Sequence, residues 1–385
     1  MARFKKIALF ADGYYAQLPQ LLGLQRGFQQ IGIECFAGWP LPPPEQMDTF
    51  VQIWQPDVVF EFDRTRGQLG DCVDSVLHVG WIQNHRNFGA PVYAGAGSSD
   101  LHYADLLPER YNFDTHTTEY KWLLPGADET VFYPKNTLPY LYDFNLCGYM
   151  FMPLSDADIN QSVVINGIDC GKVVDYIAAV HQADLLTYQT YDVRAIHEVL
   201  LSVIHRTYAG MTLEALPDNF KDLFDGRLFR TLNRKRVVDG MLAVSQSVAL
   251  CGGQTWAAWP KFAPHYRGNI TNTHELADIY RQTRISVHDS LIGMHHRTME
   301  VMACGRALMV NHASTDGSPI DIANYFTPGE DFIWYDPENF AQTAREALAD
   351  PAQLERIGQN AHRKIHDAHL WRHRAQQIVR DIGEI

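Results

Sequence analysis

Residues 293–305 read Gly-Met-His-His-Arg-Thr-Met-Glu-Val-Met-Ala-Cys-Gly, a polar cluster that lies between two apolar segments. Residues 284–288 before it and residues 307–311 after it have the length and composition of strands, whereas the cluster itself has the composition of a loop that runs into a helix. The sequence therefore predicts a strand, loop, helix and strand in succession, which is the βαβ element of a parallel sheet.

The start of the predicted helix carries the most informative side chains. Because the helix begins just after Gly293, its unpaired N–H groups and the positive end of its dipole face whatever the loop holds, and that arrangement favours a phosphate. Arg297 and Glu300 share one face of the helix. A carboxylate one turn inside an anion-binding helix is suited to the hydroxyls of a ribose. The alternative is that Arg297 and Glu300 form a surface ion pair and that the histidines are loop residues without a role.

The pattern Gly-x-His-x-Arg-x-x-Glu followed by Met-Ala-Cys-Gly resembles the nucleotide-sugar motif of GT-B glycosyltransferases, in particular the group related to the spore maturation protein CgeB. The resemblance covers residues 227–311 well and residues 6–134 weakly. It implies an α/β protein of two Rossmann-like domains that face a central cleft. It also implies that Gly293, His295, Arg297 and Glu300 bind the sugar donor.

The same resemblance adds donor-binding residues upstream of the motif. Residues 248–251 have the pattern of a strand that runs into Gly252-Gly-Gln-Thr-Trp256. In the resembling family a Gly-rich turn with a tryptophan follows this strand and lies beside the base of the donor. We therefore expect Gly252 and Trp256 in the donor site.

No metal ion is expected at the phosphates. The acidic pair Glu61-Phe-Asp63 lies at a strand end of the presumed first domain, far from the phosphate helix, and is interpreted as a polar strand terminus. The growing charge of a diphosphate leaving group would then be neutralised by helix N–H groups and by cationic side chains, for which the candidates are Arg230, Arg297 and Arg234.

The length of 385 residues exceeds one typical hydrophobic core and predicts two domains. We expect an acceptor-side domain over residues 1–138 and a nucleotide-sugar domain over residues 139–370. Within the second domain, residues 155–225 have mainly helical periodicity and form an insertion, which is either a packing elaboration or an acceptor platform. The last helix, residues 371–385, is expected either to pack back on the first domain or to end its own domain.

Alternating strands and helices predict the Rossmann-like first domain. The expected strands are residues 6–11, 32–36, 58–62, 78–82 and 91–94. In such sheets ligands collect at the carboxyl ends of the strands, so residues that directly follow a strand are candidates for a catalytic base.

Two residues of this kind are the catalytic candidates. His85 follows the strand at 78–82, where several GT-B families place a functional histidine, and it is the first candidate for the base. Asp12 follows the first strand and is the second candidate. For each residue the alternative is a loop side chain that only forms hydrogen bonds, and His78 is assigned to the strand itself.

Composition excludes some classes of function. The formal net charge of −13 argues against a broad nucleic-acid surface, although residues 227–236 are basic and form either a local patch or the solvated face of a helix. The sequence lacks an apolar run of bilayer length, and its first apolar segment is too short for a signal peptide. The six cysteines show no zinc or Cys-x-x-Cys spacing, which is typical of a cytoplasmic protein with reduced thiols.

These observations predict a cytoplasmic, metal-independent GT-B glycosyltransferase that transfers a hexose-type sugar from a nucleoside diphosphate, with a UDP-sugar favoured and no cofactor. The acceptor stays open among a protein, a glycan, a metabolite and a modified base, as does the oligomeric state. The alternatives are a nucleotide-sugar epimerase of the same fold and a catalytically silent protein that binds sugar nucleotides.

Overall fold

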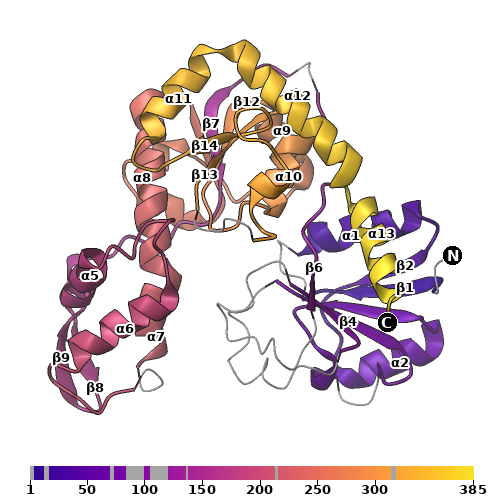
Figure 1. The fold of residues 1–385 in the computed structure, drawn as a ribbon, viewed down its shortest axis with the longest axis horizontal. Helices are drawn as coiled ribbons and strands as arrows, with labels where there is room; N and C mark the ends of the chain where they lie inside the picture. Colours follow the sequence, from indigo (N-terminus) through magenta and orange to yellow (C-terminus); the bar gives the residue numbers. More distant parts are fainter. Residues whose placement is uncertain are drawn as a thin grey trace.

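A computed structural model of the chain describes residues 4–12, 17–69, 73–83, 99–104, 120–135, 138–212, 216–313 and 318–385. In this part of the chain, two six-stranded parallel sheets form the centres of two α/β domains, and a third, two-stranded sheet lies in an arm that extends from the second domain (Figure 1).

The first sheet has the strand order β2-β1-β3-β4-β5-β6, and all neighbouring strands are parallel. The strands are β1 (Lys6–Phe10), β2 (Glu34–Gly38), β3 (Val58–Phe62), β4 (Leu77–Ile82), β5 (Leu101–Ala104) and β6 (Tyr120–Trp122). Helices α1 (Leu18–Gln30) and α2 (Pro44–Trp54) connect the first three strands. β3 is buried along its whole length, as expected for a central strand of a sheet that is covered on both faces. The strand predicted at residues 91–94 lies outside the described residues.

The second sheet has the order β11-β10-β7-β12-β13-β14 and is also parallel throughout. Its strands are β7 (Tyr142–Cys147), β10 (Val248–Cys251), β11 (Tyr266–Gly268), β12 (Thr283–His288), β13 (Ala307–Asn311) and β14 (Ile333–Tyr335). Its helices are α8 (Leu228–Val244), α9 (Thr273–Arg281), α10 (His296–Ala303), α11 (Phe340–Ala349) and α12 (Pro351–Ala368).

The strand order places Asp12 and the loop before α10 at equivalent positions of the two sheets. In each sheet the connections leave in opposite directions from two adjacent strands, β1 and β3 in the first and β7 and β12 in the second. Ligands of open α/β sheets bind at the carboxyl ends of such strands. The loop that precedes α10 follows β12, and Asp12 follows β1. The prediction of an α/β protein with two Rossmann-like domains is confirmed, and the predicted boundary at residue 138 lies between β6 and β7.

The chain crosses between the domains twice, and the two crossings are bonded to each other. The N–H of Ala127 donates to the carbonyl of His369 at 2.9 Å, and the N–H of Trp371 donates to the carbonyl of Ala127 at 3.2 Å. After this point α13 (Trp371–Ile382) lies along α1 of the first domain (Figure 1). Gly23 and Gly27 of α1 allow this close approach, because a Cβ at either position would collide with Trp371.

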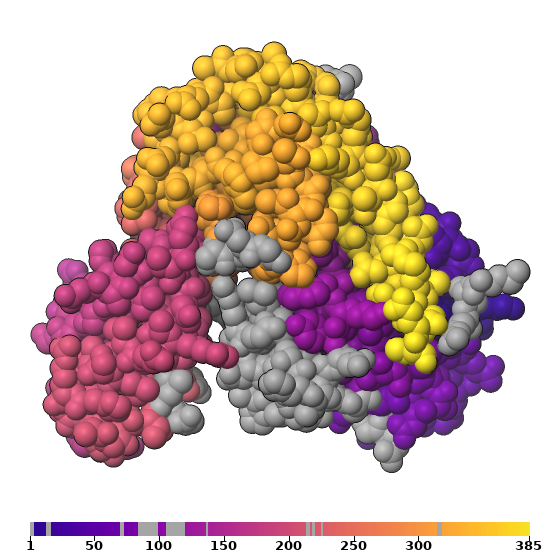
Figure 2. Space-filling model, viewed as in Figure 1, coloured from indigo at the N-terminus to yellow at the C-terminus, as the bar shows by residue number. Residues whose placement is uncertain are grey.

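The arm has a hydrophobic core of its own. It contains α4 (Asp156–Asn160), β8 (Ser162–Ile165), β9 (Ile168–Lys172), α5 (Val173–Gln182), α6 (Val193–Ile204) and α7 (Asp218–Asp222), and Figure 2 shows it projecting from the body of the molecule. The expectation of a mainly helical segment omitted the β8–β9 hairpin. The sequence signal for this hairpin is the Asn166-Gly167 pair, which forms the turn between the two short strands with φ of 51° and 80°.

Within the described residues, none of the helices combines the length and the apolar character that crossing a membrane requires.

Candidate donor site

The site is built around the start of α10. His295 is the N-cap residue of this helix, and its Nδ1 accepts a hydrogen bond from the backbone N–H of Arg297 at 3.2 Å. A ring nitrogen can accept only when it is unprotonated, so His295 is neutral in this arrangement. Burial, followed by the charges of His296 and Arg297, holds the pKa of His295 well below its ordinary value.

Three histidine rings lie against one another here. The ring centres of His288 and His295 are 5.2 Å apart, and those of His295 and His296 are 3.9 Å apart. Burial lowers the pKa of His288 to about 3, with the Arg297 charge acting in the same direction, and the pKa of His296 is lowered for the same two reasons. His288 donates from Nε2 to the carbonyl of Ile292 at 2.8 Å, which orders the loop before the helix. The positive charge of the site near neutral pH therefore comes from arginine.

Glu300 is buried beneath the helix start, with 8% of its surface exposed. Its carboxyl accepts a hydrogen bond from the hydroxyl of Tyr280 in α9 at 3.2 Å. Burial raises the pKa of Glu300 to about 7, although the charge of Arg297 and the bond from Tyr280 oppose this rise. No ion pair joins the side chains of Arg297 and Glu300, so the alternative of a surface ion pair does not describe this structure.

Several polar atoms near the helix start have no protein partner. Within the part of the chain that the structure describes, the buried atoms Arg297 Nε, Thr298 Oγ1 and Asn311 Nδ2 make no hydrogen bond. Arg297 and Thr298 lie in the first turn of α10, and Asn311 ends β13 and accepts from the N–H of Ser290 at 2.8 Å. An unpaired buried donor is costly, and a ligand rich in oxygen acceptors would satisfy it.

The two expected arginines of α8 differ in their surroundings. The guanidinium of Arg230 lies 5.9 Å from the centre of the Phe151 ring, and its charge contributes to the lowered pKa of His295. Arg234 is buried and bonded to the loop after β12, through Nε to the Asp289 carboxylate at 3.0 Å and Nη2 to the Asp289 carbonyl at 2.9 Å. The Asp289 carboxylate also accepts from the Tyr188 hydroxyl at 2.5 Å. Arg234 therefore fixes the loop rather than carrying a free charge.

The Gly-rich turn after β10 is tightly packed against the turn after β7. Gly252 has φ of +126°, and a Cβ there would collide with the carbonyl oxygen of Gly148, so glycine is required. Trp256 is fully buried and donates from Nε1 to the same carbonyl at 2.8 Å. The ring that the sequence suggested beside the base thus lies in the core of the second domain. Gly293 also sits close to a neighbour, since a Cβ there would lie 3.0 Å from Ile322.

The catalytic candidates of the first domain are only partly described. Asp12 is exposed beyond the end of β1, and in the described part of the chain no hydrogen bond or ion pair joins it to α10. His85 lies outside the described residues. His78 lies in β4 as expected; it is fully buried, with Nε2 3.0 Å from a Glu61 oxygen and Nδ1 2.9 Å from Ser99 Oγ.

The acidic residues Glu61 and Asp63, at the end of β3, are hydrogen-bonded to other groups of the protein. Glu61 is bonded to Arg64 and His78, and these bonds hold its pKa below the ordinary value against the opposing effect of burial. Asp63 accepts from Gln17 Nε2 and from the N–H of Gln83, both at 2.6 Å. Among the described residues, no group of three or more His, Cys, Asp and Glu side chains is arranged to hold a metal ion.

Tyr280 and Asn311 belong to the site but were not among the residues predicted from the sequence. Asn311 was expected only as the end of the strand at residues 307–311. The sequence offers one signal for Asn311, which is a polar residue at the carboxyl end of a strand next to β12. We find no sequence signal that distinguishes Tyr280 from other tyrosines.

Comparison with known proteins agrees with this fold. Residues 227–380 match a family model described as glycosyl transferase-like. The structure of Anabaena Alr3699/HepE in complex with UDP-glucose superposes with a TM-score of 0.54 at 10% sequence identity, over 99% of this chain and 100% of that chain. The same protein in complex with UDP and glucose gives a TM-score of 0.51 at 11% identity, with the same coverage. No curated protein sequence matches the chain.

At these identities the structural likeness shows the fold, which is GT-B. The segment that matches the glycosyl transferase-like family model carries α8, α10 and α12.

Proposed function

We propose that the chain is a glycosyltransferase of the CgeB-related group that takes a hexose-type sugar from a nucleoside diphosphate. The observation that carries this proposal is the start of α10, where the unpaired Arg297 Nε and the buried Glu300 carboxyl lie within one helical turn of each other. These groups match the phosphate and ribose parts of a sugar nucleotide.

The diphosphate would lie at the first turn of α10. Its proposed partners are the guanidinium of Arg297 and the positive end of the helix dipole, with Arg230 as a second cation. The N–H groups of Met294 and His295, which were expected to bind phosphate, instead donate to the carbonyls of Ile320 and Gly293, both at 3.0 Å. Because the three histidines are neutral, the arginines supply the charge that stabilises the departing diphosphate. This charge model needs no metal ion.

The ribose would bond to Glu300. A carboxyl with a pKa of about 7 is partly protonated near neutral pH, and hydroxyl donors from a ribose would favour its ionised form. Binding of the donor would then release a proton from Glu300. Such coupling gives donor binding a pH dependence that the Tyr280 bond alone does not produce.

The donor we favour is a UDP-sugar, since HepE, which shares the fold, was solved with UDP-glucose and with UDP and glucose. The acceptor would approach from the first domain, where His85 is the first candidate for the general base and Asp12 the second. We place the activity in the cytoplasm, because the described cysteines are all free thiols, namely Cys35, Cys147, Cys170, Cys251 and Cys304.

Calorimetric titration with UDP, GDP, ADP and dTDP tests the donor site first, followed by incubation with the matching sugar nucleotides. We expect one nucleotide to bind and its sugar to be lost slowly to water or rapidly to an added acceptor. Conversion of the sugar without any acceptor or hydrolysis would identify an epimerase, and binding without turnover across an acceptor library would identify a silent binding protein. Failure of all four nucleotides to bind would reject the site.

A further inference from the structure

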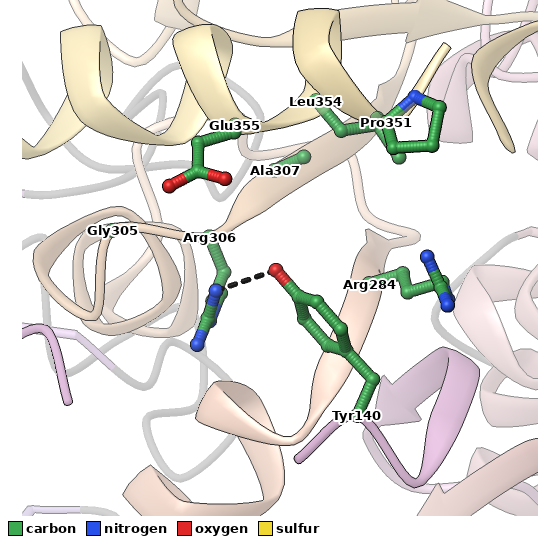
Figure 3. Close-up of a pocket in the computed structure, with 8 residues that line it drawn as sticks. All are labelled: Tyr140, Arg284, Gly305, Arg306, Ala307, Pro351, Leu354 and Glu355. Carbon is green, nitrogen blue, oxygen red and sulfur yellow. Dashed lines mark hydrogen bonds between the residues drawn. The ribbon is translucent and has the colours of Figure 1, made fainter. Parts of the chain in front are cut away.

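A second pocket lies at the amino ends of the strands of the second sheet, whereas α10 begins beyond the carboxyl end of β12. Its walls are formed where strands begin: Tyr140 just before β7, Arg284 at the start of β12, and Arg306 just before β13. The first turn of α12, with Leu354 and Glu355, closes one side (Figure 3). The pocket opens to solvent, and its cavity volume is about 70 Å³. Since the strands are parallel, this edge is the far end of the sheet from the loop after β12.

Two arginines flank one tyrosine in this pocket. Arg306 Nη1 donates to the Tyr140 hydroxyl at 2.6 Å. The guanidinium carbons of Arg306 and Arg284 lie 4.8 Å and 5.0 Å from the centre of the Tyr140 ring, close enough for cation–π attraction. Figure 3 shows the tyrosine between the two arginines. The tyrosine thus holds two positive charges at one edge of the sheet.

The charge of Arg306 is not compensated by the protein. In the described part of the chain no carboxylate lies within ion-pair distance of it, and its Nε is buried without an acceptor. Arg284 differs, because it pairs with Asp143 at 3.2 Å. Glu355 is on the wall of the pocket, but its carboxylate accepts from Gln359 at 3.2 Å and forms no pair with Arg306. Only the Nε of Arg306 is buried, and the rest of its side chain is partly exposed at the pocket, so an anion in the adjoining space would balance its charge.

We infer that this pocket is a binding site for a small anion, a phosphate or carboxylate group held by the guanidinium of Arg306 with Arg284 beside it. A guanidinium offers donors in a planar fork that matches the oxygens of either group. The aromatic ring of Tyr140 keeps the two arginines apart and in place. This site is separate from the donor site and does not depend on the proposed transfer reaction.

The test compares anions at equal ionic strength. The thermal midpoint of unfolding is measured with sodium phosphate, glucose 6-phosphate and sodium citrate, each against sodium chloride, and the dissociation constant of any stabilising anion is measured by calorimetry. The first two arms separate free phosphate from a phosphate ester, and citrate reports a carboxylate ligand. We expect at least one of the three to stabilise the protein beyond chloride.

Variants assign the effect to the pocket. Arg306→Gln should weaken binding of that anion at least about tenfold. Arg297→Gln at the donor site and Arg267→Gln, which alters an exposed arginine outside the pocket, should leave it unchanged. If Arg306→Gln does not fold, Arg284→Gln, which alters the other arginine of the pocket, should also weaken binding.

Three results would overturn the proposal. The first is that no anion stabilises the protein more than chloride. The second is equal affinity in the parent and in Arg306→Gln, or in Arg284→Gln where that variant replaces it. The third is loss of binding in Arg297→Gln alone, because that would assign the anion to the donor site.

Discussion

The hydroxyl of Tyr280 and the carboxyl of Glu300 form a buried hydrogen bond of 3.2 Å between α9 and α10. Burial raises the pKa of both groups, that of Glu300 to about 7 and that of Tyr280 well above its ordinary value. Tyr280 therefore stays protonated as the donor, while Glu300 changes its charge near neutral pH. This pair couples the proposed ribose site to pH.

The first prediction concerns stability. The pKa of Glu300 is about 7 in the folded state against an ordinary value of 4.5, so between these pH values the folded chain holds a proton that the unfolded chain has lost. The free energy of unfolding should therefore decrease as pH rises through this window, by up to about 1.4 kcal/mol per pH unit from this group. Urea unfolding of the parent and of Glu300→Gln at pH 5 and pH 8 measures the difference. An identical pH dependence in the two proteins would show that Glu300 does not titrate in this window.

The second prediction concerns donor affinity. Glu300→Gln should weaken binding of the preferred nucleoside diphosphate by about 1–3 kcal/mol, because the ribose hydroxyls lose a charged acceptor. In the parent, the affinity for the nucleoside diphosphate should decrease as the pH drops below 7, since Glu300 is then protonated and must give up a proton to accept from the ribose. Comparing both proteins at each pH removes the contribution of the nucleotide's own titration. Glu275→Gln, an exposed residue of α9, is the matched control, and calorimetry is the measurement.

The third prediction concerns the leaving group. Arg297→Ala should lower turnover by roughly a hundredfold or more, because it removes a cation placed at the departing diphosphate. Arg297→Lys retains the charge and should recover part of the loss. Arg267→Ala, which removes an exposed arginine over the Tyr142 ring, should have no effect. Equal activity in the parent and in Arg297→Ala would show that the phosphates do not bind at the start of α10.

The fourth prediction concerns metal ions. Because the charge model relies on the helix dipole and on arginines, activity should survive EDTA without loss. Turnover measured with the chelator, and again after addition of Mg²⁺ or Mn²⁺, decides the point. A loss that either ion restores would contradict the model.

The βαβ unit around residues 293–305 was predictable because two apolar segments of strand length flank one polar segment that runs into a helix. This pattern is a local property of the chain. Trp256 was assigned to a ligand by resemblance, whereas tertiary packing places its ring against the Gly148 carbonyl in the core. Packing between α9 and α10 likewise brings Tyr280 to Glu300. Such contacts depend on how distant segments meet, and no single-sequence pattern encodes them.

The hairpin of the arm shows a different limit. Its strands have four and five residues and are flanked by helices, so the helical periodicity on both sides dominated the prediction. Only the Asn166-Gly167 turn marks it locally, and a two-residue turn signal is weak without long strands.

The fifth prediction separates two histidines of the first domain. His85 follows a strand end, and a neutral imidazole near pH 7 is a suitable base for an acceptor hydroxyl, so His85→Ala should lower turnover at least about a hundredfold while leaving donor affinity nearly intact. His78→Ala should act differently, since it removes one hydrogen-bond partner of the buried Glu61 carboxylate, which keeps Arg64, and this should cost about 1–3 kcal/mol of folding free energy. Steady-state kinetics with saturating donor, together with urea unfolding of both variants, distinguishes a lost base from a lost fold. If His85→Ala is as active as the parent, the base is Asp12 or the reaction retains configuration and uses no protein base.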